Sequence, residues 1–393
     1  KVALEKALSN SLLVLTGGPG TGKTTTIKGL LTLLEARGKV VVLAAPTGRA
    51  AKRMSEATDR EAKTIHRLLK FNPSDMAFEK NFENPLEADA IIVDEVSMVD
   101  VVLMNSLLRA IPISSTLVLV GDVDQLPSVG PGNVLKDIIT SGAAEVVGLN
   151  EIFRQAQTSS IVMNAHTILA GEFPDLRRDR ESDFFLLEEE DPSQVCEVIA
   201  ALCKTRLPRT YGVDPVEDIQ VLTPMYRGDT GATNLNGVLQ DVLNPSGKEF
   251  QRGGSRFRVG DKVMQVRNNY DKDVFNGDMG RIEAIDDDAH ALAVRFLDKL
   301  VEYESAELDE IVLSYAITVH KSQGSEYRIV VLPLTTQHFV MLQRNLLYTA
   351  ITRARDLVVI VGSRKALSIA IRNNQVSERY SSLPERIRMS DYS

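Results

Sequence analysis

One octapeptide constrains the fold of this 393-residue chain more than any other feature. Residues 17–24 read GGPGTGKT, the phosphate-loop pattern G-x-x-x-x-G-K-T, between the apolar run Leu12–Thr16 and the helical pattern Gly22–Ala36. Glycines let the backbone N–H groups of such a loop curl around phosphate oxygens, and the helix N-terminus adds a favourable dipole. The sequence therefore predicts a strand–loop–helix unit that binds a nucleotide.

Further apolar runs extend this unit into a doubly wound α/β domain. The β-branched segments Lys39–Ala45, Ala90–Asp94 and Thr116–Gly121 alternate with amphipathic helical patterns such as Asp100–Ala110. This alternation is typical of a parallel sheet with helices on both faces, in which ligands bind at the carboxyl ends of the strands. Phe71–Glu87 interrupts the alternation with turn residues, charges and aromatics, so we expect a small hairpin or loop there.

A second α/β pattern begins near residue 151. Its predicted strands are Asp218–Thr223, Val312–Thr318, Arg328–Leu332 and Leu357–Val361. Between the first two of these, short strands separated by Gly and Asp turns predict a small antiparallel barrel inserted in the second domain. We therefore expect a first domain at 1–150, a second domain at 151–247 and 310–393, and the barrel at 248–309. The polar end, Asn373–Ser393, is expected to fray.

Composition narrows the class of protein. The chain is 44% apolar and 25% charged, which excludes a disordered or fibrous protein, and it has no apolar run long enough for a membrane span. Its net charge of −8 argues weakly against nucleic-acid binding, although the average over several domains can hide a basic channel. Cys196 and Cys203 lie about 10 Å apart on a helical pattern, beyond disulfide reach, so we expect buried thiols in a reducing cytoplasm. Because the chain starts at Lys1 without a Met or a signal peptide, we expect a fragment of a longer protein.

The residues at the predicted sheet edge fit hydrolysis of a nucleoside triphosphate. Lys23 is expected to reach the β- and γ-phosphates, and Thr24 to ligate Mg²⁺. Asp94 and Glu95 end the third predicted strand, where the aspartate can hold the metal through water and the glutamate can deprotonate the attacking water. The alternative for this acidic pair is a capping role at the next helix. These features predict hydrolysis but do not indicate what the hydrolysis drives.

Three other side chains are candidates for completing the catalytic site. Gln125 follows the fourth predicted strand, so it can sense the γ-phosphate from the neighbouring strand end. Arg154 and Arg353 stand in uncharged local contexts of the second half, from which a cation can complete the transition-state clamp. Ordinary loop and cap chemistry is the alternative role for Gln125, and a structural ion pair is the alternative role for Arg154.

Several polar loops that follow predicted strands suit contact with a second anion, such as a nucleic-acid phosphate. They are Ala45–Ala51 with Thr47, Thr64–Arg67, Leu222–Arg227 and Thr318–Glu326. Hydroxyls, amides and basic side chains are the usual phosphate-contacting groups, but each loop is equally compatible with ordinary helix capping.

The order of the motifs resembles a known family. GGPGTGKT, APTGRAA, TIHRLL, DEVSM, GDVDQLP, FRQ, LTPMYRG, TVHKSQGSE and YTAITRAR resemble, in sequence order, the motifs of RecD-like superfamily 1B DNA helicases. This resemblance implies two RecA-like parallel-sheet motor domains, a small first-domain hairpin at 71–87 that parts the duplex, and an inserted SH3-like β-barrel. In the hairpin, Phe78 or Phe82 is a candidate for stacking on an unpaired base. The alternative is a surface loop that packs its phenylalanines against its own domain.

The resemblance also implies an activity and partners. It implies an ATP-dependent 5′-to-3′ DNA helicase of the cytoplasm, with ATP and Mg²⁺ as cofactors and a place in DNA repair or recombination. Its partners are single-stranded DNA and a duplex with a 5′ single-stranded tail. Two departures stand out, because the glutamine that reads adenine upstream of the first helix and the N-terminal domain of longer members are missing from this sequence.

The matching positions receive roles from the resemblance. The expected catalytic residues are Lys23, Asp94, Glu95, Gln125, Arg154 and Arg353, and the expected metal ligands are Thr24 and Asp94. The expected ATP contacts are Gly18, Pro19, Gly20, Thr21, Gly22, Lys23, Thr24, Thr25, Gly324 and Glu326. The expected DNA contacts are Pro46, Thr47, Arg49, Thr64, His66, Thr223, Pro224, Asn269, Thr318, His320 and Lys321.

Two other functions share most of these features. A nucleotide-controlled clamp on nucleic acid, without processive movement, uses the same phosphate loop. An RNA helicase is a further alternative, because none of the motifs reads a 2′-hydroxyl.

Overall fold

The computed structural model describes residues 2–153, 156–176, 182–252, 254–297, 299–374, 379 and 381–390. The chain forms two compact units: Lys1–Thr158 with Gln375–Ser393, and Ser159–Asn374. The polypeptide therefore passes from one unit to the other twice. This division differs from the prediction at two places, since the first unit extends eight residues beyond 150 and the end of the chain groups with the first unit instead of the second.

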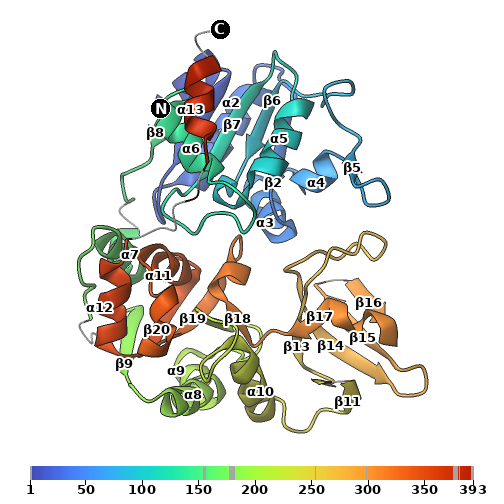
Figure 1. The fold of residues 1–393 in the computed structure, drawn as a ribbon, viewed down its shortest axis with the longest axis vertical. Helices are drawn as coiled ribbons and strands as arrows, with labels where there is room; N and C mark the ends of the chain where they lie inside the picture. The colour runs from blue at the N-terminus through green and yellow to red at the C-terminus, as the bar shows by residue number, and fades with distance from the viewer. Residues whose placement is uncertain are drawn as a thin grey trace. The chain divides into compact units, whose positions relative to one another are not determined.

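The first unit is built on a six-stranded parallel sheet (Figure 1). Its strands, in spatial order, are β3 (Ala62–Thr64), β2 (Val41–Ala45), β6 (Ala90–Val93), β7 (Thr116–Gly121), β1 (Leu12–Thr16) and β8 (Glu145–Gly148). Successive residues of these apolar strands point to opposite faces, so Leu13 and Leu15 enter one core cluster while Val14 enters another.

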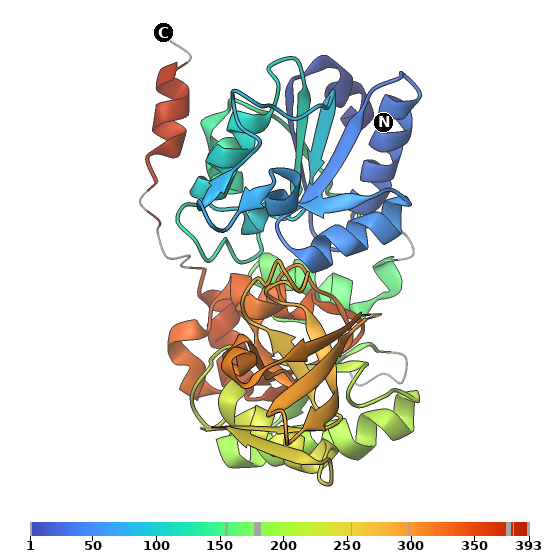
Figure 2. The same ribbon diagram turned by 90° about the vertical axis from the view of Figure 1, so that its right-hand side faces the viewer.

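Helices cover both faces of this sheet. The first face carries α1 (Val2–Ser9), α2 (Lys23–Glu35) and α3 (Gly48–Thr58). The second face carries α4 (Ile65–Leu68), α5 (Val101–Ala110) and α6 (Val134–Ser141). The last helix, α13 (Leu383–Ser390), packs against α6, and Figure 2 shows it (red) beside this unit. The expectation that the end of the chain frays is therefore wrong for this helix, because a partner in the first unit holds it.

The interruption at 71–87 contains a two-stranded antiparallel hairpin, β4 (Phe71–Asn72) with β5 (Ala77–Phe78). The rings of Phe71 and Phe78 lie 5.1 Å apart, and Phe78 packs against the core of the first unit. Phe82, in contrast, is 75% exposed. Only the second of the two candidate phenylalanines is therefore free to meet a ligand.

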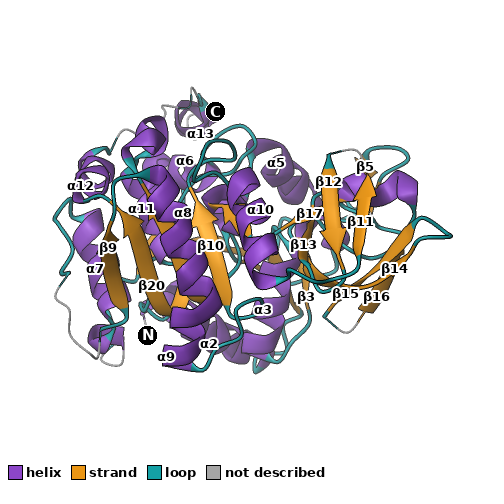
Figure 3. Cartoon of the chain, turned by 90° about the horizontal axis from the view of Figure 1, so that it is seen from below, coloured by secondary structure: helices purple, strands orange, loops and turns teal. Residues whose placement is uncertain are grey.

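The second unit contains a five-stranded parallel sheet (Figure 3). Its strands, in spatial order, are β18 (Ala316–Thr318), β10 (Ile219–Thr223), β19 (Tyr327–Leu334), β20 (Ala354–Gly362) and β9 (Phe184–Glu188). One face is covered by α8 (Pro192–Ala201), α9 (Leu207–Tyr211) and α10 (Ala232–Leu243). The other is covered by α7 (Ser160–Leu169) and α11 (Arg344–Ile351), with α12 (Arg364–Arg372) against α11. Cys196 and Cys203 are both buried free thiols in the first of these layers.

An antiparallel barrel interrupts the second unit, as predicted. Its five-stranded sheet contains β16 (Lys299–Tyr303), β15 (Ala291–Phe296), β14 (Met279–Asp286), β13 (Lys262–Gln265) and β17 (Ile311–Leu313), and a separate hairpin contains β11 (Glu249–Arg252) and β12 (Ser255–Arg258). We call β11 through β17 the inserted barrel.

The predicted single strand Val312–Thr318 is wrong. The structure divides it into β17, which pairs with β13 of the inserted barrel, and β18, which pairs with β10 of the parallel sheet. Between them the Ser314 N–H donates to the Lys262 carbonyl, and the Tyr315 hydroxyl donates to Asp261 (3.0 Å). These two bonds hold the chain where it leaves one sheet for the other.

Among the described residues, no helix has the length and apolar character that crossing a bilayer requires.

A buried histidine links the loop after β19 to the loop after β10. The Thr335 N–H donates to His338 Nδ1 (3.3 Å), so the ring proton resides on Nε2, which donates to Thr230 Oγ1 (2.9 Å). Burial lowers the pKa of His338 to about 4 from the ordinary 6.5. The folded protein therefore keeps this ring neutral at pH values where an unfolded chain protonates it.

We predict that His338 makes the second unit less stable as the pH falls from 6.5 to about 4. In this range the unfolded state binds a proton that the folded state does not, so the free energy of unfolding decreases with decreasing pH. His338→Asn should remove this slope, measured by urea unfolding at several pH values. His290→Asn is the matched control, since His290 is exposed and has a positive φ of 50° that Asn tolerates. An unchanged slope in His338→Asn would contradict the assignment.

Candidate functional site

The topology of the first sheet gathers the predicted catalytic segments. Strands β6, β7 and β1 are neighbours and run parallel, so their carboxyl ends share one edge. The phosphate loop follows β1, the Asp94–Glu95 pair follows β6, and Asp122–Gln125 follows β7. Three segments that are far apart in sequence therefore meet at the place where α/β sheets bind ligands.

The phosphate loop has the backbone that its glycines allow. Gly20 and Gly22 adopt left-handed φ values of 70° and 82°, and Gly22 caps the N-terminus of α2. A Cβ on Gly22 would come within 2.2 Å of the Phe153 ring, so no larger residue fits at that position without displacing the ring. The loop is thus a glycine-dependent cradle at the start of a 13-residue helix, which fits a bound phosphate.

Lys23 is held by this same cradle. Its Nζ donates to the carbonyls of Gly17 (2.6 Å) and Gly18 (2.9 Å), and the Thr21 hydroxyl also donates to Gly18 (2.8 Å). The ammonium group therefore lies against the loop that surrounds the phosphate position. Thr24 and Thr25 follow in the first turn of α2.

The acidic pair lies at the end of β6 in a strained backbone. Glu95 has a φ of 54°, which a non-glycine residue rarely adopts, and its N–H donates to Asp94 Oδ1 (2.8 Å). Burial, and then repulsion from Glu95, raise the pKa of Asp94 to about 6 even though Lys23 and Arg53 oppose this shift. Arg53 Nη1 lies 3.9 Å from Glu95 Oε1. Charging the buried Asp94 therefore costs free energy that Lys23 and Arg53 offset only in part.

A divalent cation beside Asp94 would stabilise its charged form. Asp94 and the Thr24 hydroxyl are oxygen ligands of the kind that Mg²⁺ prefers. No group of three or more His, Cys, Asp or Glu side chains in the described ranges could hold a metal ion, so a cation here depends on phosphate oxygens and water for its other ligands. That is the usual arrangement of a phosphoryl-transfer site.

Gln125 is 8% exposed at the same edge. Its Nε2 donates to Asp122 Oδ2 (3.3 Å), whereas Oε1 accepts no hydrogen bond from any described residue. A buried amide oxygen without a donor is unfavourable, and a water or phosphate-bound water would satisfy it. Gln125 is therefore suited to contact a group that the protein does not supply.

The predicted DNA contacts of the first unit lie along the same sheet edge. Ala45 of β2 pairs with Thr64 of β3, which aligns the loop of Pro46, Thr47 and Arg49 with the loop that begins at Thr64. The Thr47 and Thr64 hydroxyls accept from the N–H groups of Ala50 (3.2 Å) and Arg67 (3.1 Å), so both are helix caps.

His66, a predicted DNA contact, is half-buried beside two aromatic rings. Its ring lies 5.6 Å from the ring of Phe71 and 5.6 Å from that of Phe78, and burial lowers its pKa. The side chain therefore helps pack the 71–78 hairpin onto the first unit.

In the second unit, Thr223 of β10 pairs with Thr318 of β18, so the two predicted DNA-contacting loops also share a sheet edge. Thr318 caps a 3₁₀ turn, Val319–Ser322, that contains His320 and Lys321. The Thr223 hydroxyl donates to the Thr230 carbonyl (2.7 Å) inside the protein, directly before Pro224. Asn269 lies in the inserted barrel and donates to Glu310 (3.1 Å).

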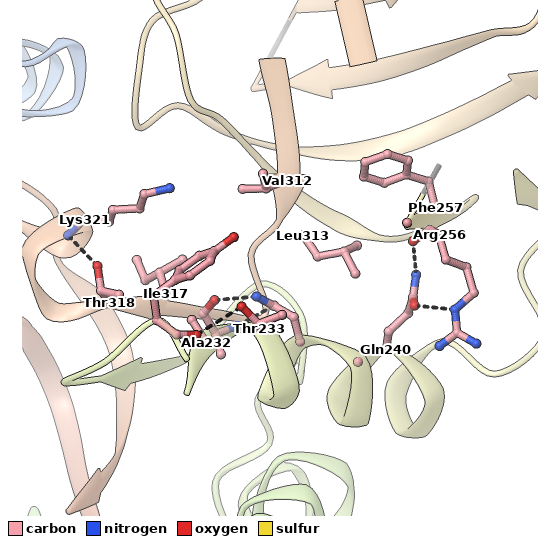
Figure 4. Close-up of a pocket in the computed structure, with 15 residues that line it drawn as sticks. Ala232, Thr233, Gln240, Arg256, Phe257, Val312, Leu313, Ile317, Thr318 and Lys321 are labelled. Carbon is pink, nitrogen blue, oxygen red and sulfur yellow. Dashed lines mark hydrogen bonds between the residues drawn. The ribbon is translucent and has the colours of Figure 1, made fainter. Parts of the chain in front are cut away.

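A cavity of about 300 Å³ opens beside this edge, between α10 and the inserted barrel (Figure 4). Phe257, Leu313 and Ile317 provide apolar walls, while Lys321 and Arg256 lie at opposite ends. The Arg256 guanidinium donates to Gln240 Oε1 (3.1 Å) and Asp241 Oδ1 (2.8 Å). The cavity thus combines an apolar surface with a cation next to the predicted phosphate contact Thr318.

The predicted ATP-contacting residues of the second unit lie close together. Arg353 is 3% exposed, and its Nη1 donates to the Ser325 carbonyl (3.3 Å), which stands between Gly324 and Glu326. The Arg353 carbonyl accepts from the Tyr327 N–H (2.8 Å). Arg154 lies outside the described residues.

Sequence reasoning missed two arginines near the catalytic edge. Arg53 is on α3 opposite Glu95, one turn after Arg49 of the APTGRAA segment, so helical periodicity could have indicated it. Arg379 is in the tail that we expected to fray, yet it binds the loop that follows Gln125. No local sequence signal marks this second arginine.

Three segments of the chain match known domain families. Residues 1–131 match the family described as AAA domain, residues 235–296 match the ATP-dependent RecD-like DNA helicase SH3 domain, and residues 313–361 match the UvrD-like helicase C-terminal domain. The second match begins within α10 and covers most of the inserted barrel.

Curated relatives align with nearly the whole chain. The ATP-dependent RecD2 DNA helicase of Deinococcus radiodurans is 41% identical over 385 residues, which cover 98% of this chain and 51% of the relative. The RecBCD enzyme subunit RecD of Mycobacterium tuberculosis is 32% identical over 409 aligned positions, which cover 95% of this chain and 70% of the relative. The chain therefore spans about half the length of the first relative.

A solved structure shares the fold. Bacteroides Pif1 bound to single-stranded DNA matches with a TM-score of 0.58 over 99% of this chain and 97% of that one, at 20% sequence identity. At this identity the likeness supports the architecture alone.

We predict that Asp94→Asn makes the protein more resistant to heat at pH 7.5 in the absence of nucleotide and Mg²⁺. Because the pKa of Asp94 is raised, keeping its carboxylate charged in the folded state lowers the free energy of unfolding. This loss of stability is complete above pH 6 and absent below pH 3.8, the ordinary pKa of the group. The asparagine retains the oxygen that accepts from the Glu95 N–H. Thermal melts at pH 7.5 and pH 4 test this, and the difference should shrink at the lower pH.

Glu95→Gln is the matched variant, because it removes the neighbouring charge but leaves the buried Asp94 in place. It should raise the melting temperature less than Asp94→Asn does. An Asp94→Asn protein that melts at or below the parental temperature at pH 7.5 would count against the buried-charge interpretation.

Proposed function

The chain belongs to the RecD-like DNA helicases, and from this premise we propose that it is the motor region of an ATP-dependent DNA helicase that moves 5′-to-3′ on single-stranded DNA. The observation that supports this proposal most directly is the convergence of the phosphate loop, the Asp94–Glu95 pair and Gln125 at one edge of the first sheet. The second parallel sheet, with its own edge of threonines and Lys321, supplies the second grip that a translocating motor needs.

In the proposed reaction the oxygen of a water molecule attacks the γ-phosphorus of ATP, and the bond from that phosphorus to the β–γ bridging oxygen breaks. The water gives a proton to Glu95, and the products are ADP and inorganic phosphate. Lys23 and the loop N–H groups stabilise the charge on the phosphates, while Gln125 orients the water. Thr24 and Asp94 would hold Mg²⁺, which supplies positive charge to the phosphate oxygens.

We propose that Arg353 supplies a further positive charge to the transition state and that Gly324 and Glu326 contact the nucleotide. Support comes from the hydrogen bond that ties Arg353 to the loop of Gly324–Glu326. A guanidinium held in one position stabilises developing phosphate charge more effectively than a mobile one. The same role for Arg154 is part of the proposal.

The strand-binding part of the proposal rests on the two aligned sheet edges. Thr47 and Thr64 mark one edge, and Thr223 and Thr318 mark the other. Contacts from hydroxyls, N–H groups and Lys321 to phosphates position a strand without reading its sequence. The cavity beside Lys321 has apolar walls, which include the half-buried Leu313, that a base can contact.

We propose that hydrolysis alternately tightens and loosens the two grips so that the strand advances. We also propose that the segment 71–87, with the exposed Phe82, separates the duplex. A role in DNA repair or recombination and a cytoplasmic location remain predictions. The two competing functions, an RNA helicase and a nucleotide-controlled clamp, differ from the helicase in measurable ways.

The deciding experiment compares duplexes that carry a 5′ tail, a 3′ tail or no tail. We predict ATP-dependent unwinding of the 5′-tailed DNA only, and hydrolysis stimulated by single-stranded DNA more than by RNA of the same sequence. Lys23→Ala should abolish both activities, because the loop has no other side-chain cation to neutralise the phosphates. Stimulated hydrolysis without unwinding would favour the clamp, and stronger stimulation by RNA would favour the RNA helicase.

We further predict that Arg353→Ala lowers kcat for ATP by about 10³-fold and changes ATP affinity much less, because an arginine of this kind acts on transition-state charge. Arg355→Ala is the matched control. Its side chain is 65% exposed and pairs with Asp356, so its loss should leave kcat near the parental value. Equal effects of the two substitutions would assign Arg353 a structural role.

A further inference from the structure

The end of the chain is anchored to the first unit by two arginines. On α13, the Arg388 guanidinium donates to the carbonyls of Thr140 (2.6 Å) and Ser141 (3.4 Å) at the end of α6. Upstream of α13, Arg379 donates to three other carbonyls, those of Ser128 (2.6 Å), Gly130 (2.6 Å) and Gly132 (2.7 Å). Arg379 thus makes the denser set of contacts, and it makes them to a loop.

This loop, residues 126–132, directly follows Gln125. Ser128 is buried, and its hydroxyl donates to the Gly130 carbonyl (3.1 Å) in addition to contacting Arg379 (3.3 Å). Leu126 is buried as well. Because Gln125 is directly bonded to this held loop, its position depends on how the loop is held.

The same loop packs against the start of α5. The Pro131 carbonyl accepts from the Val101 N–H (3.0 Å), and a Cβ on Gly130 would come within 2.0 Å of Asp100 Oδ2. Asp100 caps α5 and is joined to Glu95 by one short 3₁₀ turn, Val96–Met98. The loop therefore lies between Arg379 on one side and the segment after the acidic pair on the other.

Only an arginine suits the geometry that Arg379 has here. Three carbonyl oxygens and a hydroxyl converge on one guanidinium, which presents five N–H donors in a rigid plane. A lysine ammonium offers three donors from a single point and cannot span the same set. Nη1 and Nη2 both take part, so the contact fixes orientation as well as position.

We propose that Arg379 is a positioning residue for ATP hydrolysis. By binding the carbonyls of loop 126–132, it holds Gln125 and, through the start of α5, the Asp94–Glu95 segment in register with the phosphate loop. This inference rests on the proposed hydrolase activity.

The test measures DNA-stimulated ATPase kinetics of Arg379→Ala, Arg379→Lys and Arg388→Ala. We expect Arg379→Ala to lower kcat by about 10- to 100-fold with the KM for ATP nearly unchanged, because a catalytic group displaced by even 1 Å loses this much. Arg379→Lys should recover little of the rate. Arg388→Ala, which loses contacts of the same tail away from the loop, should keep the parental kcat.

Rescue distinguishes positioning from folding. Millimolar guanidinium ion should restore part of the activity of Arg379→Ala and have no such effect on Arg388→Ala, and thermal melts of the two variants should be similar. A parental kcat in Arg379→Ala overturns the inference. A loss of kcat that guanidinium does not rescue, with a melting temperature well below that of Arg388→Ala, also overturns it and leaves only a structural role. An inactive parental protein instead overturns the proposed function.

Discussion

The functional geometry of the first unit depends on the adjacency of three parallel strands, β6, β7 and β1. Parallel strands need no side-chain recognition to bring their carboxyl ends together, because the backbone ladder and the crossover helices do so. What the side chains contribute is burial: these strands are almost wholly enclosed, with residues such as Ile92 and Val118 without exposed surface. The enclosed apolar strands give the strained Glu95 and the buried Asp94 a rigid base on which their unfavourable conformations persist.

In the second unit, the corresponding rigid element is polar. The buried carboxylate of Asp261, in the inserted barrel, accepts from Gln240 (2.6 Å) and Asn244 (2.7 Å) of α10 and its C-terminus. It also accepts from the Tyr315 hydroxyl (3.0 Å), just before β18. Burial raises the pKa of Asp261, and these hydrogen bonds oppose the shift by stabilising the charged form. One residue thus joins the barrel to both neighbouring elements and keeps the walls of the cavity beside Lys321 in place.

The sequence predicted the parts of the fold in which local pattern and final burial agree. β1 and β7 begin and end where their apolar runs do, and the phosphate loop follows from its spacing alone. Val312–Thr318 was wrongly predicted as one strand, because no turn residue interrupts it. The backbone partner nevertheless changes, from Val263 of the inserted barrel opposite Leu313 to Val221 of the parallel sheet opposite Ala316. Sheet membership is a long-range property, so no window of sequence around that segment contains it.

The candidate site shows the same limit more sharply. Motif residues such as Thr47 and Thr318 are where the spacing predicted, at strand ends. Phe78, predicted as a stacking candidate, instead packs with Phe71 and His66 because three aromatic rings near one core bury more apolar surface together than apart. Arg379 was missed because an arginine in a polar tail has the sequence pattern of any solvated residue. The three carbonyls that it binds lie more than 240 positions earlier in the chain, so no local pattern indicates them.

The negative net charge of the chain is compatible with a nucleic-acid ligand, because anion binding depends on the groups close to the ligand. Many acidic side chains are already paired on the surface, as Asp218 and Asp356 are with Arg328, so they add little negative potential beyond their immediate surroundings. The proposed phosphate contacts depend on other groups: threonine hydroxyls at helix starts, backbone N–H groups and the ammonium group of Lys321. Such groups bind an anion through fixed dipoles at short range, which the net charge of −8 barely affects. The polar groups within a few ångströms of each strand end are therefore a better guide to a polyanion ligand than the net charge of the whole chain.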